Sequence, residues 1–349
     1  MDALASSLER SPELFPHAWD LRSDAVTLIR LTRADYEKAS FLDERVLKPH
    51  TLTRTLPFGQ LAASVSVGKL EERSDFLFHI GHVGSTLLSR LLDAGGGVFA
   101  LREPAILRTL ARMHSDPELQ PRVWDGAEFE DRLSLLLKLW SRTFEPGQSA
   151  VIKATSFVSE LAAQLLARPS APKAVLLFVR PESYIATILG GANARQEAKL
   201  LTDGRLKRLH RRIGREVWRL ASFSEGEGLA LSWAAEMSAL VDAQHAAGAR
   251  ALSLDFDRFL ESPQEKLSAV FRHFDSDASP DAVARVLASP HMQRYSKAPE
   301  HAYSPELRRE ILDDARKAHA AEIAKGLAWL ERAANEFPII AECLAMSSR

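Results

Sequence analysis

From residue 76 onward, short apolar stretches alternate with segments in which apolar residues recur every three or four positions. The apolar stretches predict strands at 76–80, 98–101, 150–152, 174–179 and 251–254. The periodic segments predict helices near 86–94, 104–114, 129–143, 157–168, 182–190, 205–222 and 228–247. Because strands and helices alternate, we expect an α/β fold of three layers, with a parallel sheet of about five strands and helices on both faces.

The two ends of the chain follow other patterns. Residues 1–70 hold scattered prolines and one predicted strand at 25–31, so we expect an N-terminal region distinct from an α/β core at 71–290. Residues 291–349 should add a polar loop and then a helix over roughly 305–335, which packs on the core through an apolar face. In the predicted core, most polar residues of interest follow strands, where ligands bind in parallel sheets.

Composition narrows the class of protein. The chain has 349 residues, 46% of them hydrophobic, and a formal net charge of −1, so we expect no nucleic-acid partner and any anion site must be a local basic cluster. No apolar stretch approaches the roughly 20 residues of a membrane-spanning helix, and residues 1–15 lack the apolar run of a signal peptide. With Cys343 as the single cysteine, these features predict a cytoplasmic protein without a membrane partner, and leave its oligomeric state open.

The stretch DFLFHIGHVGSTLLSRLLD, residues 75–93, joins a predicted strand, a glycine turn and a predicted helix. Such a connection aims backbone N–H groups and the positive end of the helix dipole at one point, which predicts an anion-binding loop. Its candidate residues are Gly81, His82, Val83, Gly84, Ser85 and Thr86. Alternatively, Ser85 or Thr86 only caps the helix. A triphosphate-binding loop reads GxxxxGK[ST], and Ser85 stands at the lysine position, so a triphosphate is disfavoured.

Two charged residues follow the second and third predicted strands. Glu103, in ALREP, can take a proton from a bound hydroxyl, or it can complement a helix dipole ahead of Pro104. Lys153, in AVIKATS, can stabilise charge on a transferred group, or it can be a solvated lysine at a strand end.

Further basic residues come later in the chain. Arg180 ends the fourth predicted strand, where it can clamp an anion or pair with a surface acid, and Ser183 and Thr187 lie on one face of the next helix. The arginines of 205–219 predict an amphipathic helix with a solvated basic side. Lys297, in QRYSKAP, can close over a bound phosphate or belong to a polar linker. His79 and His82 lack the acidic or cysteine partners of a metal site, so we expect no metal.

With these residues the chain resembles the sulfotransferase family, whose donor is 3′-phosphoadenylyl sulfate and whose fold is P-loop-like. The family's loop commonly reads KSGTT or RSGST, and GHVGSTLL shares its Gly-Ser-Thr half. SLDFDRFLESPQEKLSAVFRHF, residues 253–274, also resembles the family's late strand, acidic-aromatic turn and Pro-led helix, so the likeness runs through about 70–300. The resemblance implies that Gly84, Ser85 and Thr86 hold the 5′-phosphosulfate.

The family's second signature is an arginine after a later strand and a hydroxyl residue usually eight positions on, which together bind the 3′-phosphate. Arg180 matches the first; the eighth position is Ile188, so Thr187 is an approximate match. His82 replaces the loop's basic residue, and Thr155 stands where animal-type members have a histidine base. REP with Glu103 is similar to the GEP motif of some bacterial carbohydrate sulfotransferases.

The resemblance therefore implies sulfuryl transfer from 3′-phosphoadenylyl sulfate to a hydroxyl or amine of a small acceptor whose identity the sequence does not predict. Glu103 would deprotonate the acceptor, while Lys153 and His82 would stabilise charge on the sulfuryl and leaving oxygens. Arg180, Thr187 and Lys297 would hold the 3′-phosphate, and no metal is demanded. Two alternatives remain: an ATP-dependent kinase in which Asp255 holds Mg²⁺, and a catalytically silent nucleotide-binding protein on the same fold.

Overall fold

The computed structural model describes residues 2–65, 70–115, 123–276, 278–294 and 304–348, and its centre is a five-stranded parallel sheet in the order β5-β6-β4-β7-β8. The strands are β4 (Asp75–His79), β5 (Val98–Arg102), β6 (Ser149–Lys153), β7 (Ala174–Phe178) and β8 (Ala251–Asp255). All five were predicted, each to within one residue at either end. Fully buried strands of this kind read as continuous apolar runs, which is why the sequence pattern located them.

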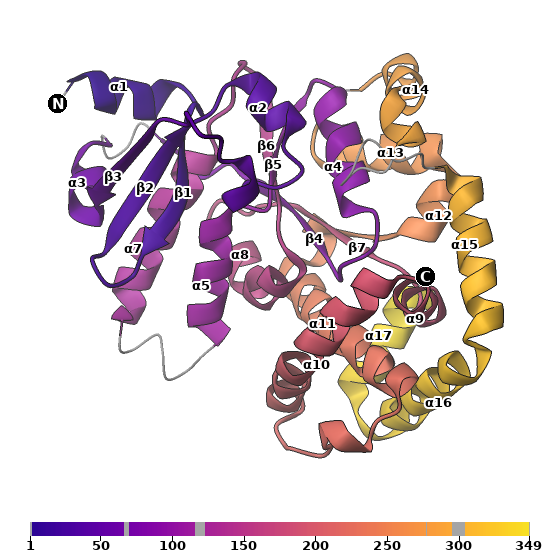
Figure 1. The fold of residues 1–349 in the computed structure, drawn as a ribbon. Helices are drawn as coiled ribbons and strands as arrows, with labels where there is room; N and C mark the ends of the chain where they lie inside the picture. The colour runs from indigo at the N-terminus through magenta and orange to yellow at the C-terminus, as the bar shows by residue number, and fades with distance from the viewer. Residues whose placement is uncertain (1, 66–69, 116–122, 277, 295–303, 349) are drawn as a thin grey trace.

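Helices cover both faces of this sheet, as an α/β fold requires (Figure 1). The helices are α1 (Asp2–Arg10), α2 (Arg33–Lys38), α3 (Phe58–Ala63), α4 (Ser85–Ala94), α5 (Ala105–Ser115), α7 (Gly126–Trp140), α8 (Ala162–Leu166), α9 (Pro181–Leu189), α10 (Ala192–Ile213), α11 (Glu225–Ala247), α12 (Phe256–Glu261), α13 (Pro263–His273), α14 (Pro280–Leu287), α15 (Pro305–Ala318), α16 (Ala320–Glu336) and α17 (Pro338–Ser348). Helix α4 packs on β4, β5 and β6, and α11 packs on β4, β7 and β8. The fold is therefore the predicted three-layer, P-loop-like arrangement.

The N-terminal residues form a second, antiparallel sheet of three strands in the order β1-β2-β3. These strands are β1 (Leu14–Asp20), β2 (Ala25–Arg30) and β3 (Thr53–Pro57). Only β2 was predicted, because Pro16 interrupts β1 and β3 is mostly exposed and polar. The guanidinium of Arg142, just after α7, donates to the carbonyls of Leu8, Ser11 and Leu14 and so fixes this region to the rest of the chain.

Three helix predictions were wrong in detail. The helix expected at 205–222 is α10, which begins at Ala192 and ends before Gly214, a residue with a φ of 75°. The segment expected as one helix at 157–168 is a short 3₁₀ helix, Ser156–Leu161, followed by α8. The expected helix at 305–335 is divided at His319 into α15 and α16.

Two glycines let the C-terminal helices pack tightly on the core. A Cβ added at Gly226 of α11 would lie 1.8 Å from the carbonyl oxygen of Glu322 in α16. A Cβ added at Gly326 would lie 2.6 Å from the carbonyl oxygen of Gly226. Because no side chain fits at either position, the backbones of α11 and α16 approach closely, and α16 in turn contacts α9 and α17.

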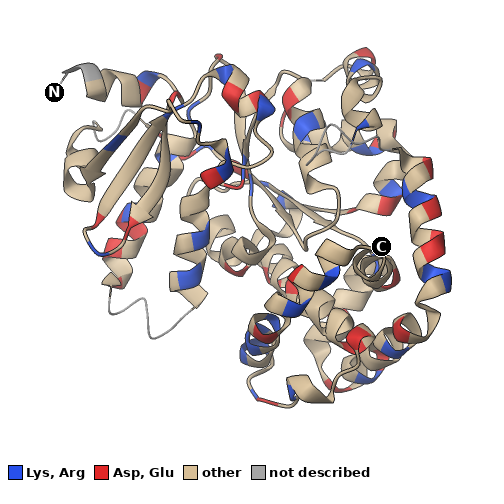
Figure 2. Ribbon diagram, viewed as in Figure 1, with Lys and Arg blue, Asp and Glu red and all other residues tan. Residues whose placement is uncertain are grey.

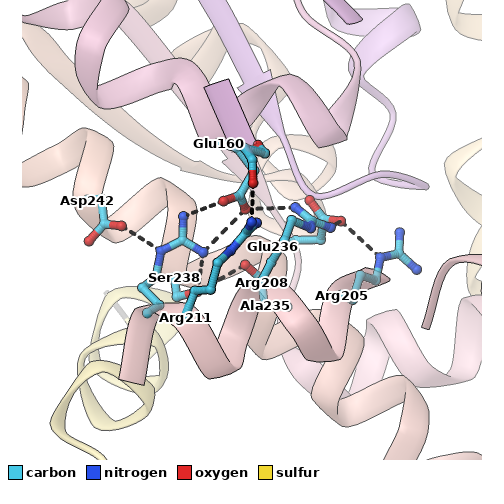
Figure 3. A network of polar contacts seen from close by, with 10 residues as sticks. Glu160, Arg205, Arg208, Arg211, Ala235, Glu236, Ser238 and Asp242 are labelled. Carbon is cyan, nitrogen blue, oxygen red and sulfur yellow. Dashed lines mark hydrogen bonds and ion pairs between the residues drawn. The ribbon is translucent and has the colours of Figure 1, made fainter. Parts of the chain in front are cut away.

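Part of the basic side of α10 is buried, which corrects part of the prediction of a solvated face; Lys207 and Arg211 are exposed as predicted. Arg205 and Arg208 have exposed fractions of 4% and 6%, and both donate to the carboxylate of Glu236 in α11 at 2.9 and 2.7 Å. Figure 3 shows Arg208 between Glu236 and Glu160, which it also reaches at 2.7 Å. Burial opposes ionisation of Glu236, but Arg208 and Arg205 outweigh it and hold the pKa of this carboxyl below its ordinary value. Arg205 and Arg208 therefore hold α10 to α11 and are not available to a ligand at the surface.

Within the described part of the chain, no helix combines the length and the apolar character that crossing a membrane requires.

Candidate functional site

The loop between β4 and α4 has the backbone geometry of an anion-binding turn. Gly81, His82 and Gly84 have φ angles of 84°, 54° and 69°, a left-handed region that non-glycine residues such as His82 rarely occupy. The ring Nδ1 of His79 accepts a hydrogen bond from the Gly81 N–H at 3.0 Å and so fixes the turn. Helix α4 begins at Ser85, and no side chain caps its N-terminus. The first N–H groups of α4 are thus left for a partner other than a capping side chain.

Gly84 is required at its position for a second reason besides its φ. A Cβ there would lie 2.0 Å from the ring of Phe256, the first residue of α12. Phe256 therefore covers one side of the loop. The hydroxyl oxygen of Thr86 is buried and has no hydrogen-bond partner among the described residues, so it can receive a ligand at the loop.

His82 contacts an acidic residue of α10. Its Nε2 lies 3.3 Å from a carboxylate oxygen of Glu197 in α10, and the two side chains are 22% and 59% exposed. This contact ties the loop to α10. The sequence could not predict it, because Glu197 is one of many charged residues on a helix.

Glu103 and Lys153 lie together at the carboxyl ends of β5 and β6. Lys153 Nζ contacts Glu103 Oε1, and the Thr155 hydroxyl donates to Glu103 Oε2 at 3.1 Å. Lys153 is fully buried, which rules out the alternative of a solvated lysine, and Glu103 is 8% exposed. Glu103 has a φ of 57°, and its N–H donates to the Lys153 carbonyl at 2.7 Å. A strained backbone held by hydrogen bonds and an ion pair is typical of functional positions.

The N-terminal region adds an aromatic ring to this pair. The Leu42 N–H donates to the Arg102 carbonyl at 2.6 Å, which places residues 41–45 beside the end of β5. The ring centroid of Phe41 lies 5.4 Å from Lys153 Nζ and 3.4 Å from the guanidinium carbon of Arg45. Sequence reasoning missed Phe41, because nothing in the local pattern connects it to strands that follow more than 50 residues later.

Arg180 is the residue before α9, and its side chain is 54% exposed. Its Nε lies 3.5 Å from Oδ2 of Asp255, so the acid that it approaches is a buried one at the end of β8 and not a surface residue. Asp255 Oδ1 accepts the Asp257 N–H at 2.8 Å, while Oδ2 has no hydrogen-bond partner among the described residues. Burial raises the pKa of Asp255, and Arg180 only partly opposes this shift.

A pocket of about 800 Å³ opens beside Arg180 and Asp255. Ser183 and three side chains of α15 (Arg308, Leu312 and Arg316) are among its lining residues. Thr187 is not a lining residue, and its hydroxyl donates to the Ser183 carbonyl at 2.6 Å. Lys297 lies outside the described residues. The structure thus brings Arg180 and Ser183 together, and it adds the arginines of α15, which the sequence pattern did not single out.

Among the described residues, no group of three or more His, Cys, Asp or Glu side chains has the arrangement of a metal site.

No protein-family model matches the chain, and no curated protein matches it. Among solved structures, a sulfotransferase domain from the curacin biosynthetic pathway is 14% identical, with a TM-score of 0.39 over 70% of this chain and 90% of that one. A sulfotransferase from Mycobacterium avium is 12% identical, with a TM-score of 0.36 over 71% of this chain and 76% of that one. A sulfotransferase from Alicyclobacillus acidocaldarius is 13% identical, with a TM-score of 0.34 over 74% of this chain and 98% of that one.

These structural neighbours belong to the family that the loop motif resembles.

Proposed function

We propose that the chain is a sulfotransferase that moves a sulfuryl group from 3′-phosphoadenylyl sulfate to a hydroxyl or amine of a small acceptor. The observation that carries this proposal is that the lysine-free loop and Arg180 follow two hydrogen-bonded strands, β4 and β7. Two anion sites at adjacent strand ends suit a nucleotide that bears one anionic group on its 5′ carbon and another on its 3′ carbon.

The loop would hold the 5′-phosphosulfate. The N–H groups from Gly81 to Thr86 and the hydroxyls of Ser85 and Thr86 would donate to its oxygens, with the helix dipole of α4 adding to the attraction. The buried, unpartnered hydroxyl of Thr86 fits this role. A sulfuryl group carries less charge than a phosphoryl group, so the loop functions without the lysine of triphosphate-binding proteins and without a metal.

Arg180 and Ser183 would bind the 3′-phosphate at the pocket. Arg180 can present two parallel N–H donors to a phosphate, and its 54% exposure leaves room for that anion. Thr187 and Lys297 were assigned to this phosphate by resemblance. The hydrogen bond of Thr187 to the Ser183 carbonyl favours Ser183 as the hydroxyl that faces the nucleotide.

In the transfer step, the acceptor oxygen or nitrogen attacks sulfur and its proton passes to the carboxylate of Glu103. The bond between sulfur and the bridging oxygen breaks, and adenosine 3′,5′-bisphosphate leaves. Lys153 orients Glu103 through their ion pair, and Lys153 and His82 stabilise charge on the sulfuryl and leaving oxygens. Phe41, beside Lys153, would form part of the acceptor pocket.

The kinase alternative is less well supported by the geometry. A kinase would need Asp255 to hold Mg²⁺, but the guanidinium of Arg180 lies 3.5 Å from that carboxylate. A metal ion at this carboxylate would therefore lie close to the positive charge of Arg180, which opposes its binding.

The test is transfer of label from sulfur-35 3′-phosphoadenylyl sulfate to fractions of a small-molecule extract. We expect a labelled product that is formed by the wild type and not by Glu103→Gln. If no fraction is labelled although adenosine 3′,5′-bisphosphate binds, the chain is a silent nucleotide-binding protein. If ATP labelled on its γ-phosphate transfers label instead, it is a kinase.

A further inference from the structure

Helix α15 runs along the outer edge of the molecule, from the neighbourhood of α12 to α16 (Figure 1). Acidic and basic residues alternate along its length (Figure 2). Its inner side is anchored: Leu312 and Ala315 are 5% exposed, and a Cβ added at Gly190, the residue after α9, would lie 3.1 Å from the Ala315 side chain. The position of the side chains that α15 directs at the pocket is therefore defined by packing.

Arg308 fixes the N-terminal end of α15 to the loop side of the site. Its guanidinium lies 2.8 Å from Asp257 and 5.4 Å from the ring centroid of Phe256, the ring that covers Gly84. Arg316 lies eight residues, slightly more than two helical turns, further along and therefore on the same broad face of the helix. One helix thus contacts both α12, whose Phe256 covers Gly84, and, through Arg316, the start of α9.

Arg316 contacts the residues that begin α9. Its Nη2 donates to the Ser183 hydroxyl oxygen at 3.3 Å, and its Nε lies 3.3 Å from Glu182. A third contact, at 2.9 Å, joins its Nη1 to Asp313. Glu182 and Asp313 are 51% and 60% exposed, and ion pairs with such partners stabilise a protein by about 1 kcal/mol or less. A phosphate dianion can therefore replace them at low cost.

The hydrogen bond from Arg316 leaves the Ser183 hydroxyl free to donate its own proton. A serine hydroxyl has one donor and two acceptor lone pairs. Since Arg316 uses a lone pair, the O–H of Ser183 remains able to donate to an anion in the pocket. Arg316 can thus donate to an anion in the pocket itself, and it leaves the Ser183 hydroxyl able to donate to the same anion.

We propose that Arg316 is a second guanidinium for the 3′-phosphate of the donor, carried to Arg180 and Ser183 by α15. This inference rests on the proposed function. The phosphate would receive a forked contact from Arg180, the hydroxyl of Ser183 and at least one N–H of Arg316, and three oxygens suffice for all of them. The contact with Glu182 opens when the phosphate binds.

The test compares binding of adenosine 3′,5′-bisphosphate and of AMP, which lacks the 3′-phosphate, by calorimetry. Arg316→Ala should lower the affinity for the bisphosphate about 10- to 150-fold, as expected for loss of a hydrogen bond to a charged group. The affinity for AMP should change by no more than about twofold. Arg316→Lys should recover part of the loss, because it keeps the charge but not the fork. Arg309→Ala is the matched control: Arg309 lines the same pocket but is 72% exposed and paired with Glu306.

The possible results distinguish the role of Arg316 from the proposed sulfotransferase function. If wild type binds the bisphosphate no better than AMP, the proposed function fails and the inference fails with it. If wild type discriminates but Arg316→Ala behaves like Arg309→Ala, only the role of Arg316 is wrong. An equal loss for both nucleotides would show that Arg316 supports the pocket without contacting the 3′-phosphate. Losses in Ser183→Ala and Arg316→Ala that do not add in the double variant would support the shared contact.

Discussion

The side chains of Glu103 and Lys153 form a buried ion pair at the ends of two neighbouring strands, although 50 residues separate them in the chain. The pair is one unit: the carboxylate is the proposed base, and the ammonium is its counter-charge. Because Lys153 is fully buried, the carboxylate of Glu103 compensates the charge of its ammonium where water does not.

Glu103→Gln should therefore have two effects. Turnover should fall about 10²- to 10⁴-fold, the usual contribution of a general base. Stability should also fall by roughly 3–5 kcal/mol, because a buried ammonium loses the carboxylate with which it forms an ion pair. Turnover is measured with the labelled donor, and stability by chemical denaturation.

A double variant separates these effects. Glu103→Gln with Lys153→Met removes both charges, so most of the lost stability should return while turnover stays low. Near-normal turnover in either variant would remove Glu103 from the mechanism and leave it only a structural role.

Arg180→Ala should lower the binding affinity for adenosine 3′,5′-bisphosphate selectively. A charge-assisted contact contributes about 1.5–3 kcal/mol, so we expect a loss of roughly 10- to 150-fold for the bisphosphate and little change for AMP. Arg195→Ala is the control, because Arg195 pairs with Glu225 and is not a lining residue of the pocket. Equal losses for the two nucleotides in Arg180→Ala would mean that Arg180 does not contact the 3′-phosphate.

Asp255→Asn should strengthen bisphosphate binding. The carboxylate of Asp255 competes with the phosphate for Arg180, and removing a like charge near a ligand is worth on the order of 1 kcal/mol, about fivefold in affinity. Asparagine retains an acceptor for the Asp257 N–H, so α12 should keep its cap. Weaker nucleotide binding together with loss of a Mg²⁺ requirement would instead support the kinase alternative.

How much of this site the sequence predicts depends on how local each feature is. The strands, the glycine loop and the residues that end strands, such as Glu103 and Arg180, follow from local patterns and the geometry of parallel sheets. Contacts between side chains on different helices and strands do not follow from local sequence patterns. Glu236 pairs with Arg205 and Arg208, and Arg316 reaches Ser183, only because the fold brings distant segments together.

Asp75→Asn should stabilise the protein at neutral pH. Burial raises the pKa of Asp75 to about 6 from an ordinary value of 3.8, so the folded state holds this proton more tightly than the unfolded state. Stability is consequently lost as pH rises from about 4 to above 6. Asparagine avoids that loss and still accepts the Lys173 N–H. The gain in unfolding free energy should be roughly 3 kcal/mol at pH 8 and about half of that at pH 5.

Denaturation of the wild type and Asp75→Asn at both pH values measures this difference. Asp131→Asn, on the exposed side of α7, should show no such pH-dependent gain. A gain in Asp75→Asn that is the same at pH 5 and pH 8 would show that its cause is not the ionisation of Asp75.

The most direct measurement of the central claim is the affinity of the wild type for adenosine 3′,5′-bisphosphate and for ATP–Mg²⁺, under identical conditions. The absence of the loop lysine and the position of Arg180 at the end of β7 predict that the bisphosphate binds much more tightly. At a concentration about 100-fold above its Kd it should raise the unfolding free energy by roughly 2.7 kcal/mol, while ATP–Mg²⁺ at the same concentration should have a much smaller effect. Binding of ATP–Mg²⁺ as tight as that of the bisphosphate, or tighter, would contradict the assignment of this chain as a sulfotransferase.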